Sequence, residues 1–324
     1  HATSTLNTKN SATNIKISGG KDVDIYGRVV AGAEITSSGL AFNGVDSTVD
    51  ISAGEQVYID TAIAASKKIS IKTTQQTSSD DNEKSLILTS SSGLSVGAKT
   101  SNNSGGAIII DVVDGVEAVG MILSGGTVSQ SFDSNGNLLS ETIAWSEEDS
   151  IVSIISAGKV AIAGNVRAVD GEIVEIGGTI RAKSSIYIEG GMSADNVGIY
   201  LPGSAKLVTY DADSIITLKA GDDAILYGLI IAGGELVDFR DAQGKFLGSE
   251  IVLKDNSTSK IYISSDKQIE LGRDLVAGSL IDVRGGAGSD NEAKAYTLGE
   301  DGYYFDKKDQ GIVIQANVHL KTLQ

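Results

Sequence analysis

The chain of 324 residues has no cysteine, one proline, one tryptophan and two histidines, and aromatic residues make up only 5% of it. The absence of cysteine excludes a disulfide framework, a thiol nucleophile and a thiolate zinc site. His319 is the only histidine apart from the first residue, which excludes multi-histidine metal sites and argues against a Ser-His-Asp triad. So few aromatic residues and prolines are untypical of a globular enzyme of this length.

Basic residues are also scarce, with 26 Lys and Arg against 42 Asp and Glu, so the formal net charge is -16. This balance argues against a nucleic-acid partner, because neutralising phosphates requires a basic face. No basic cluster suggests an anchor to anionic lipids, and apolar runs such as Ala107–Ile110 are far shorter than a membrane span, so we expect no direct membrane insertion. The chain starts at His1 without a signal-peptide pattern, and we therefore expect a processed or excised segment that has lost its targeting signal.

Glycine and aliphatic residues are abundant. There are 39 glycines, and 41% of the residues are hydrophobic. This composition is too apolar for a disordered chain. Together with the lack of proline, it is typical of a repetitive β architecture.

One short pattern recurs five times and alternates strictly between apolar and other residues. The copies start at Ile17, Ile51, Ile155, Leu218 and Ile263. In the second copy the apolar positions are Val57, Ile59, Ile63 and Ala65, and the positions between them carry residues such as Asp, Lys and Tyr in most copies. A period of two predicts strands with one buried side and one side facing water.

The centre of the apolar set is glycine in three copies, at Gly27, Gly164 and Gly228. This glycine predicts a tight corner between two short strands, where a side chain would not fit. In the third copy the set continues past the corner through Val166 and Ala168. Thr61 and Arg273 take the place of glycine in the other two copies, where we expect a different turn.

Such strands bury their apolar rows only if copies stack above and below them, each strand pairing with the next coil. The sequence therefore predicts an all-β parallel β-helix, or solenoid, with a stacked aliphatic interior, running as one continuous segment over residues 1–324. At roughly 20 residues per coil, we expect about 12–16 coils and a rod about 60–75 Å long.

A longer period of about 95–115 residues overlies the short one. Gly27, Gly120 and Gly228 align, and each is followed by a glycine-containing pair: Ala31-Gly32, Gly125-Gly126 and Gly233-Gly234. The segments Phe132–Thr142 and Phe239–Ile251 also align and predict hairpins that protrude from the rod. We expect about three imperfect repeats, roughly residues 15–112, 113–220 and 221–324.

No motif predicts catalytic, cofactor-binding or metal-binding residues. Gly285–Ala293 resembles one calcium-binding nonapeptide but stands alone, whereas each calcium is shared between tandem copies. Asp133–Asn137 resembles part of an EF-hand loop with its glycine at the wrong place, so it predicts a hairpin turn. The acidic groups Asp80/Asp81, Glu147–Asp149 and Asp222/Asp223 are scattered and predict a solvated surface. The remaining candidates for a ligand face are Tyr187, Tyr200, Tyr210, Tyr227, Tyr262, Tyr296, Tyr303 and Tyr304.

The short repeat resembles the haemagglutinin repeats of filamentous-haemagglutinin-like large exoproteins. The segments Ile51–Gly54 and Ile155–Gly158 match best, and Gly164 and Ala168 continue the pattern. The resemblance covers about half of the chain, and it implies a right-handed β-helical shaft, secretion, and a role in adhesion or cell–cell contact. The Asn-Pro motifs of the family's secretion domain are absent, so this chain is not that domain. The longer repeat is not a usual feature of the family's shaft, and a giant repetitive surface protein of another lineage stays open.

These observations predict a non-enzymatic shaft segment of a large, secreted or cell-surface bacterial protein. Its expected partners are a host or neighbouring cell surface, or a polysaccharide, and flanking repeats of the same polypeptide. Two alternatives stay open. A tailspike-like polysaccharide-binding or -degrading protein requires acids and aromatic residues clustered on neighbouring coils. A calcium-stiffened, surface-layer-like protein requires a melting temperature that rises with calcium.

Overall fold

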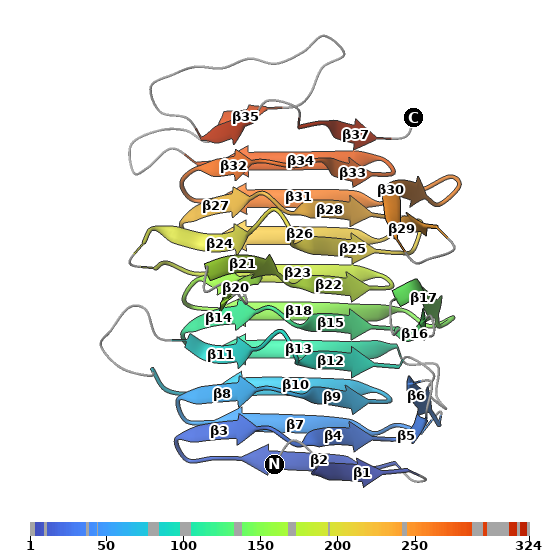
Figure 1. Ribbon diagram of the computed structural model, residues 1–324. Helices are drawn as coiled ribbons and strands as arrows, with labels where there is room; N and C mark the ends of the chain where they lie inside the picture. The colour runs from blue at the N-terminus through green and yellow to red at the C-terminus, as the bar shows by residue number, and fades with distance from the viewer. Residues whose placement is uncertain are drawn as a thin grey trace.

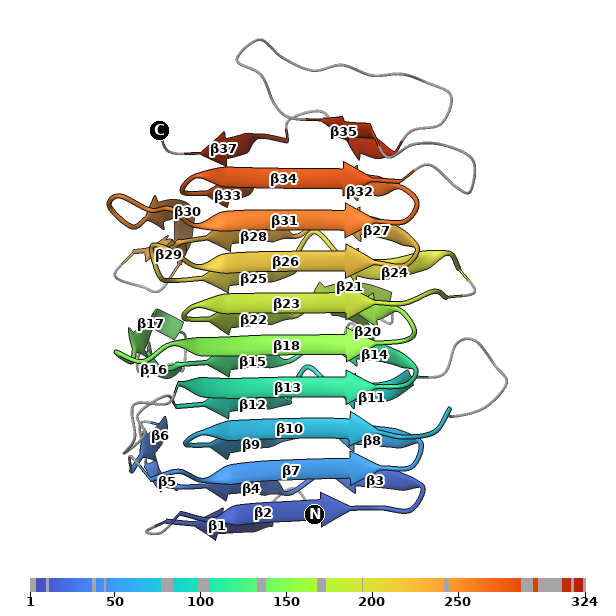
Figure 2. The ribbon, with the colours of Figure 1, turned by 180° about the vertical axis from the view of Figure 1, so that it is seen from behind.

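The computed structural model describes residues 4–9, 12–36, 39–43, 45–76, 84–97, 105–132, 138–167, 173–193, 195–241, 245–286, 294–296, 311–315 and 318–322. Within these residues the protein is all-β and contains no helix. Three long sheets of ten, ten and nine strands run the length of the molecule, and the chain visits them in the same order again and again (Figures 1 and 2). Apart from β34 with β35, neighbouring strands within these sheets are parallel, which is consistent with a parallel β-helix.

We number the sheets in the order in which one coil passes through them. Sheet 1 consists, in spatial order, of β2 (Asn14–Ser18), β7 (Thr48–Ala53), β10 (Lys68–Thr73), β13 (Gly106–Val112), β18 (Ser150–Ser156), β23 (Ser185–Gly190), β26 (Ile215–Ala220), β31 (Lys260–Ser265), β34 (Leu280–Gly285) and β35 (Lys294–Tyr296). Sheet 2 consists of β3 (Asp22–Ile25), β8 (Gln56–Ile59), β11 (Lys84–Leu88), β14 (Gly115–Ala118), β19 (Val160–Ala161), β24 (Val197–Leu201), β27 (Asp223–Leu226), β32 (Ile269–Leu271) and β36 (Ile312–Ile314). Sheet 3 consists of β1 (Thr5–Thr8), β4 (Arg28–Ala31), β9 (Ala62–Ala65), β12 (Gly93–Val96), β15 (Met121–Ser124), β22 (Thr179–Ala182), β25 (Lys206–Thr209), β28 (Leu229–Ala232), β33 (Leu275–Ala277) and β37 (Leu320–Thr322).

Four antiparallel hairpins interrupt the coils. They are β5 (Ala33–Thr36) with β6 (Gly39–Phe42), β16 (Gly126–Phe132) with β17 (Leu138–Trp145), β20 (Ala163–Arg167) with β21 (Ile173–Gly177), and β29 (Gly234–Arg240) with β30 (Phe246–Leu253). Since each coil gives sheet 2 one strand, the described residues form nine coils. The expectation of 12–16 coils was wrong, because hairpins and loops lengthen several coils beyond the repeat seen between Thr48 and Lys68.

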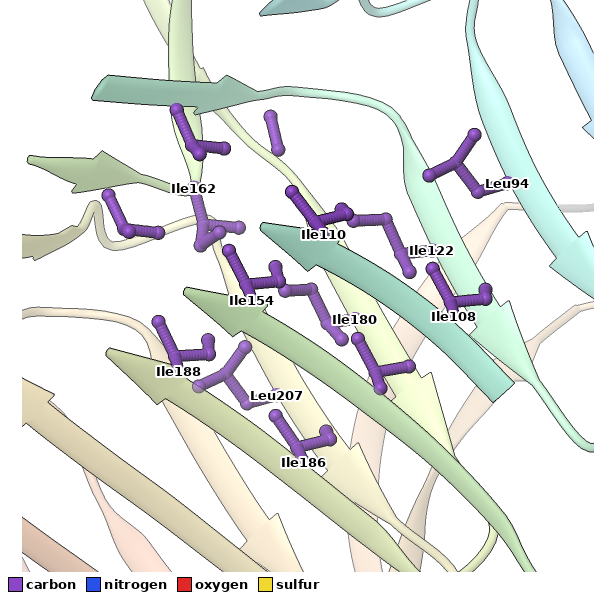
Figure 3. Packing of buried hydrophobic residues seen from close by; sticks show 14 of the residues in the cluster. Leu94, Ile108, Ile110, Ile122, Ile154, Ile162, Ile180, Ile186, Ile188 and Leu207 are labelled. Carbon is purple, nitrogen blue, oxygen red and sulfur yellow. The ribbon is translucent and has the colours of Figure 1, made fainter. Parts of the chain in front are cut away.

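The inward side chains form one aliphatic core that extends from Ile15 to Val318. Identical positions stack in register, so that Ile154 pairs with Ile110 in the coil below and Ile188 in the coil above (Figure 3). Burying each such side chain stabilises the fold by about 1.5–3 kcal/mol. The predicted core positions are all inaccessible to solvent, namely Val57, Ile59, Val160, Ile162, Leu226, Ile230, Ile269 and Leu271.

The corner between sheets 2 and 3 explains the central glycine of the repeat. A Cβ on Gly27 or Gly228 would lie 3.0 or 2.8 Å from a backbone oxygen of the coil below, so the close approach of successive coils requires glycine. In the third copy this role belongs to Gly178, where a Cβ would lie 2.4 Å from the oxygen of Ala118. The assignment of Gly164 to the corner was wrong.

The inserted hairpin β20–β21 displaces the second half of the third copy. Gly164 and Val166 lie in this hairpin, and Ala168 lies outside the described residues. After the hairpin, Ile180 and Ala182 resume the inward row and are fully buried. At the fifth copy's corner Arg273 is exposed, and its Nη1 donates a hydrogen bond to the oxygen of Gly203 at 2.6 Å, so no arginine enters the core there.

The two predicted hairpins are confirmed, and a third, β5–β6, follows an earlier strand of sheet 3 in the same way. Each follows a strand of sheet 3 through a glycine with positive φ, namely 70° at Gly32, 84° at Gly125 and 80° at Gly233. All three hairpins lie along one edge of the molecule (Figures 1 and 2).

The first and last of these hairpins do more than protrude. Residues of β5–β6 cover Val30 and Ala64 on the outer side of sheet 3. Residues of β29–β30 cover Val208, Leu229 and Ile231 in the same way. From the sequence we expected only protruding elements. The apolar residues at outward positions of sheet 3, such as Val30, Ala64 and Ile231, interrupt the alternation and are the local indication that this side is covered.

Candidate functional site: a groove at the corner of sheets 1 and 2

Within the described residues, the acidic groups named from the sequence do not converge on one site. Asp80 and Asp81 lie outside the described residues. Asp149 accepts a hydrogen bond from the Ser184 hydroxyl at 3.0 Å. Asp222 is only 2% exposed and pairs with Lys267, so its expected solvated position was wrong. Asp223 accepts the backbone N–H of Gln268 at 3.0 Å. The described acids Asp149, Asp222 and Asp223 therefore serve local structure.

The two loop motifs cannot be placed in full. Residues 133–137 lie outside the described part of the chain, and so does Gly285–Ala293 beyond Gly286. Within the described residues, no group of three or more His, Asp or Glu side chains is arranged to hold a metal ion.

The tyrosines are spread over several surfaces. Tyr187 and Tyr262 lie on the outer side of sheet 1, and Tyr200 lies on sheet 2 with Lys159 Nζ 5.3 Å from its ring centroid. Tyr210 stacks on Trp145 with centroids 5.0 Å apart. The other candidates are Tyr227 at a corner between sheets 2 and 3, Tyr296 in β35, and Tyr303 and Tyr304 outside the described residues.

A groove of about 600 Å³ runs along the outside of the molecule where sheet 1 turns into sheet 2. It crosses five successive coils, from β13 to β31. One wall is a row of outward side chains that the strand register places directly above one another: Asp111, Ile155, Glu189, Lys219 and Ser264. We call these five residues the groove row.

Small corner residues explain why the groove is hollow. Ala157, Gly191 and Gly221 occupy the turn in three neighbouring coils and line the groove. A Cβ on Gly191 would lie 1.7 Å from the oxygen of Ala157, so close stacking of the coils requires glycine there. These residues carry little or no side chain to fill the corner.

The centre of the groove row is a preorganised set of polar groups beside an apolar one. The Tyr187 hydroxyl donates a hydrogen bond to the carboxylate of Glu189, and Lys219 Nζ lies 5.2 Å from the centroid of the Tyr187 ring. Burial and the bond to Glu189 raise the pKa of the Tyr187 hydroxyl, and the contact with Tyr187 raises the pKa of Lys219. Ile155 is 40% exposed between Asp111 and Glu189.

The groove is lined by three carboxylates, those of Asp111, Glu189 and Asp266, and by the ammonium group of Lys219. Lys72 Nζ lies 3.8 Å from the Asp111 carboxylate, so the groove is weakly acidic. These groups can accept and donate hydrogen bonds to a polar ligand, and the exposed isoleucine offers it an apolar contact. An apolar surface with a few placed polar groups is a feature that ligand-binding sites share.

Sequence reasoning missed the groove row because it searched for acids that are neighbours in the chain. Asp111 and Glu189 are brought onto one face only by the stacking of β13, β18 and β23. The sequence does contain a feature that marks the groove row. In the strands of sheet 1, each groove-row residue comes just before a small or aliphatic buried residue, such as Val112, Gly190 or Ala220.

The part of the chain that the structure describes contains no helix long and apolar enough to cross a membrane. No protein-family model, no curated protein and no solved structure matches this chain.

Proposed function

We propose that the chain is a shaft segment of a large secreted or cell-surface bacterial protein, folded as one right-handed parallel β-helix and acting in adhesion or cell–cell contact. The continuous aliphatic core is the observation that supports this proposal most. One cluster of buried side chains joins all nine coils from Ile15 to Val318. Solenoids of this kind gain stability from each interface between neighbouring coils, so the segment acts as a stiff spacer.

The path of the chain supports the right-handed form. Each strand of sheet 1 leads through sheets 2 and 3 to the next strand of sheet 1, which lies parallel beside it. Crossovers between parallel strands of one sheet are right-handed in nearly all proteins. Nine coils spaced about 4.8 Å apart make a rod about 40 Å long.

The surface charge fits a spacer that stays separate from its neighbours. The formal net charge of -16 favours solubility and opposes lateral association of like rods. The hairpin edge and the groove then remain free to contact other molecules.

The spacer role is tested by placing the chain between a cell-surface anchor and a tip domain of known affinity. We expect the tip to reach about 40 Å further than without the segment, as measured by energy transfer between dyes at the anchor and tip. A Gly/Ser linker of equal length is the control, since it gives a broad distribution of distances. A broad distribution for the protein itself would refute the shaft.

A polysaccharide-binding function is a second candidate, and the groove is the observation that favours it. We propose binding without catalysis, so the purified chain should release no reducing ends or unsaturated products from common bacterial and host polysaccharides. Reproducible turnover that is lost on replacing Asp111 and Glu189 would favour a depolymerase.

A further inference from the structure

We propose that the groove binds a linear polysaccharide without negative charge, which lies along the stacking axis and crosses the groove row. This inference rests on the second proposed function and is independent of the shaft.

The geometry of the groove row suits a repeating ligand. Its five residues are in register on five consecutive coils, and neighbouring strands lie about 4.8 Å apart. A sugar unit in an extended β-linked chain advances by nearly the same distance. The row spans about 19 Å from first to last strand, which matches about four sugar units.

The side chains supply the two kinds of contact that a sugar chain requires. Ile155 is 40% exposed and can pack against the apolar face of a ring. Asp111 and Glu189 flank it in the coils below and above, where their carboxylates accept hydrogen bonds from hydroxyl or amino groups. Lys219 and Ser264 continue the row and can donate to ring or hydroxyl oxygens.

The charge of the groove selects among polysaccharides. Three carboxylates line the groove with the Lys219 ammonium group, and Lys72 Nζ lies 3.8 Å from the Asp111 carboxylate at one end of the row. The three carboxylates still outnumber the two ammonium groups, and the whole chain carries a formal charge of -16. A polymer of uronic acids is therefore repelled, whereas the ammonium groups of an amino-sugar polymer are attracted. This attraction weakens with salt, because the Debye length falls to about 10 Å at 0.1 M ionic strength.

The experiment is calorimetric titration of the full chain with hexamers of glucosamine, N-acetylglucosamine and galacturonic acid. We expect saturable binding of the first two, the glucosamine hexamer more tightly, and none of the third. A glucosamine dimer should bind at least tenfold more weakly, since it reaches only part of the row.

Two variants distinguish the contribution of the groove row to binding from that of the general surface charge. The double substitution Asp111→Asn with Glu189→Gln should weaken binding of the glucosamine hexamer by at least tenfold, because hydrogen bonds to charged groups are lost. Asp50→Asn is the control for the loss of a single surface carboxylate. Asp50 points outward from the same sheet but lies outside the groove, so its removal should leave the affinity nearly unchanged.

Three results would overturn the proposal: no saturable binding of either amino-sugar hexamer, equal binding of the galacturonic acid hexamer, or wild-type affinity in the double variant. Unchanged melting temperatures of the variants would show that the fold is intact. None of these results affects the distance measurement that tests the shaft, so the two proposals fail separately.

Discussion

Replacing Ile154 by aspartate tests the aliphatic core directly. Ile154 lies in the fifth of the nine coils, has no exposed surface, and stacks between Ile110 and Ile188. Removing its side chain costs about 2–5 kcal/mol. Burying a carboxyl there raises its pKa by roughly 3–5 units, which adds about 4 kcal/mol at pH 7, because the buried group is then largely protonated. The sum, about 6–9 kcal/mol, is comparable to the whole stability of a typical domain.

The same strand provides the control. Ile151 is 39% exposed on the outer side of β18, and its ladder neighbours Ala107 and Ser185 carry no charge. Ile151→Asp should therefore change the free energy of unfolding by no more than about 1 kcal/mol. Because the two variants have the same composition, only the direction of the side chain distinguishes them.

The assay is urea denaturation followed by circular dichroism at several pH values. An aspartate buried at position 154 has a folded-state pKa above its unfolded value, so the variant is least stable at neutral pH. It should regain stability as the pH falls through the folded-state pKa toward about 4. Substitution at position 151 should produce no comparable recovery. A cooperative transition of Ile154→Asp at the wild-type urea concentration would refute the solenoid core.

Three further outcomes follow from the turns, the hairpins and a surface carboxylate. Gly233→Ala should lower the free energy of unfolding by about 1–3 kcal/mol, because φ is 80° at this position and the new Cβ would lie 2.3 Å from two serine hydroxyl oxygens. Gly203→Ala is the control in thermal melts, since the atom nearest to its new Cβ would lie 3.9 Å away. Replacing β29–β30 by a short linker should lower the urea midpoint, because it exposes apolar side chains of sheet 3 whose burial stabilises the fold by about 1.5–3 kcal/mol each. An unchanged midpoint would show that the hairpin does not contribute to stability. Hydrogen bonds from Ser91 and Thr89 lower the pKa of Asp60, so its stabilising effect is present above about pH 4 and lost as the pH falls through the folded-state value. The melting temperature of Asp60→Asn should therefore depend less on pH in this range than that of the wild type, and equal dependence would contradict the assignment.

Where the alternation is uninterrupted, the sequence alone determined which residues of a strand face the core. Alternation at Val57, Ile59, Leu226 and Ile230 is a local property, because successive side chains of a strand point to opposite sides whatever the strand pairs with. The corner at Gly27 was equally readable, since a glycine that breaks an apolar row marks a place without room for a side chain. An all-β fold whose strands bury an aliphatic row was therefore predictable from the sequence.

Only the tertiary structure decided how the coils are counted and what their outer surfaces carry. The hairpin β20–β21 moved the third corner from Gly164 to Gly178, because an insertion breaks the sequence period without breaking the stack. The groove row likewise joins Asp111 to Glu189 through Ile155. Outward residues on different coils become neighbours only through the register of parallel pairing. That register depends on the length of every insertion between strands, which alternation within one strand does not encode.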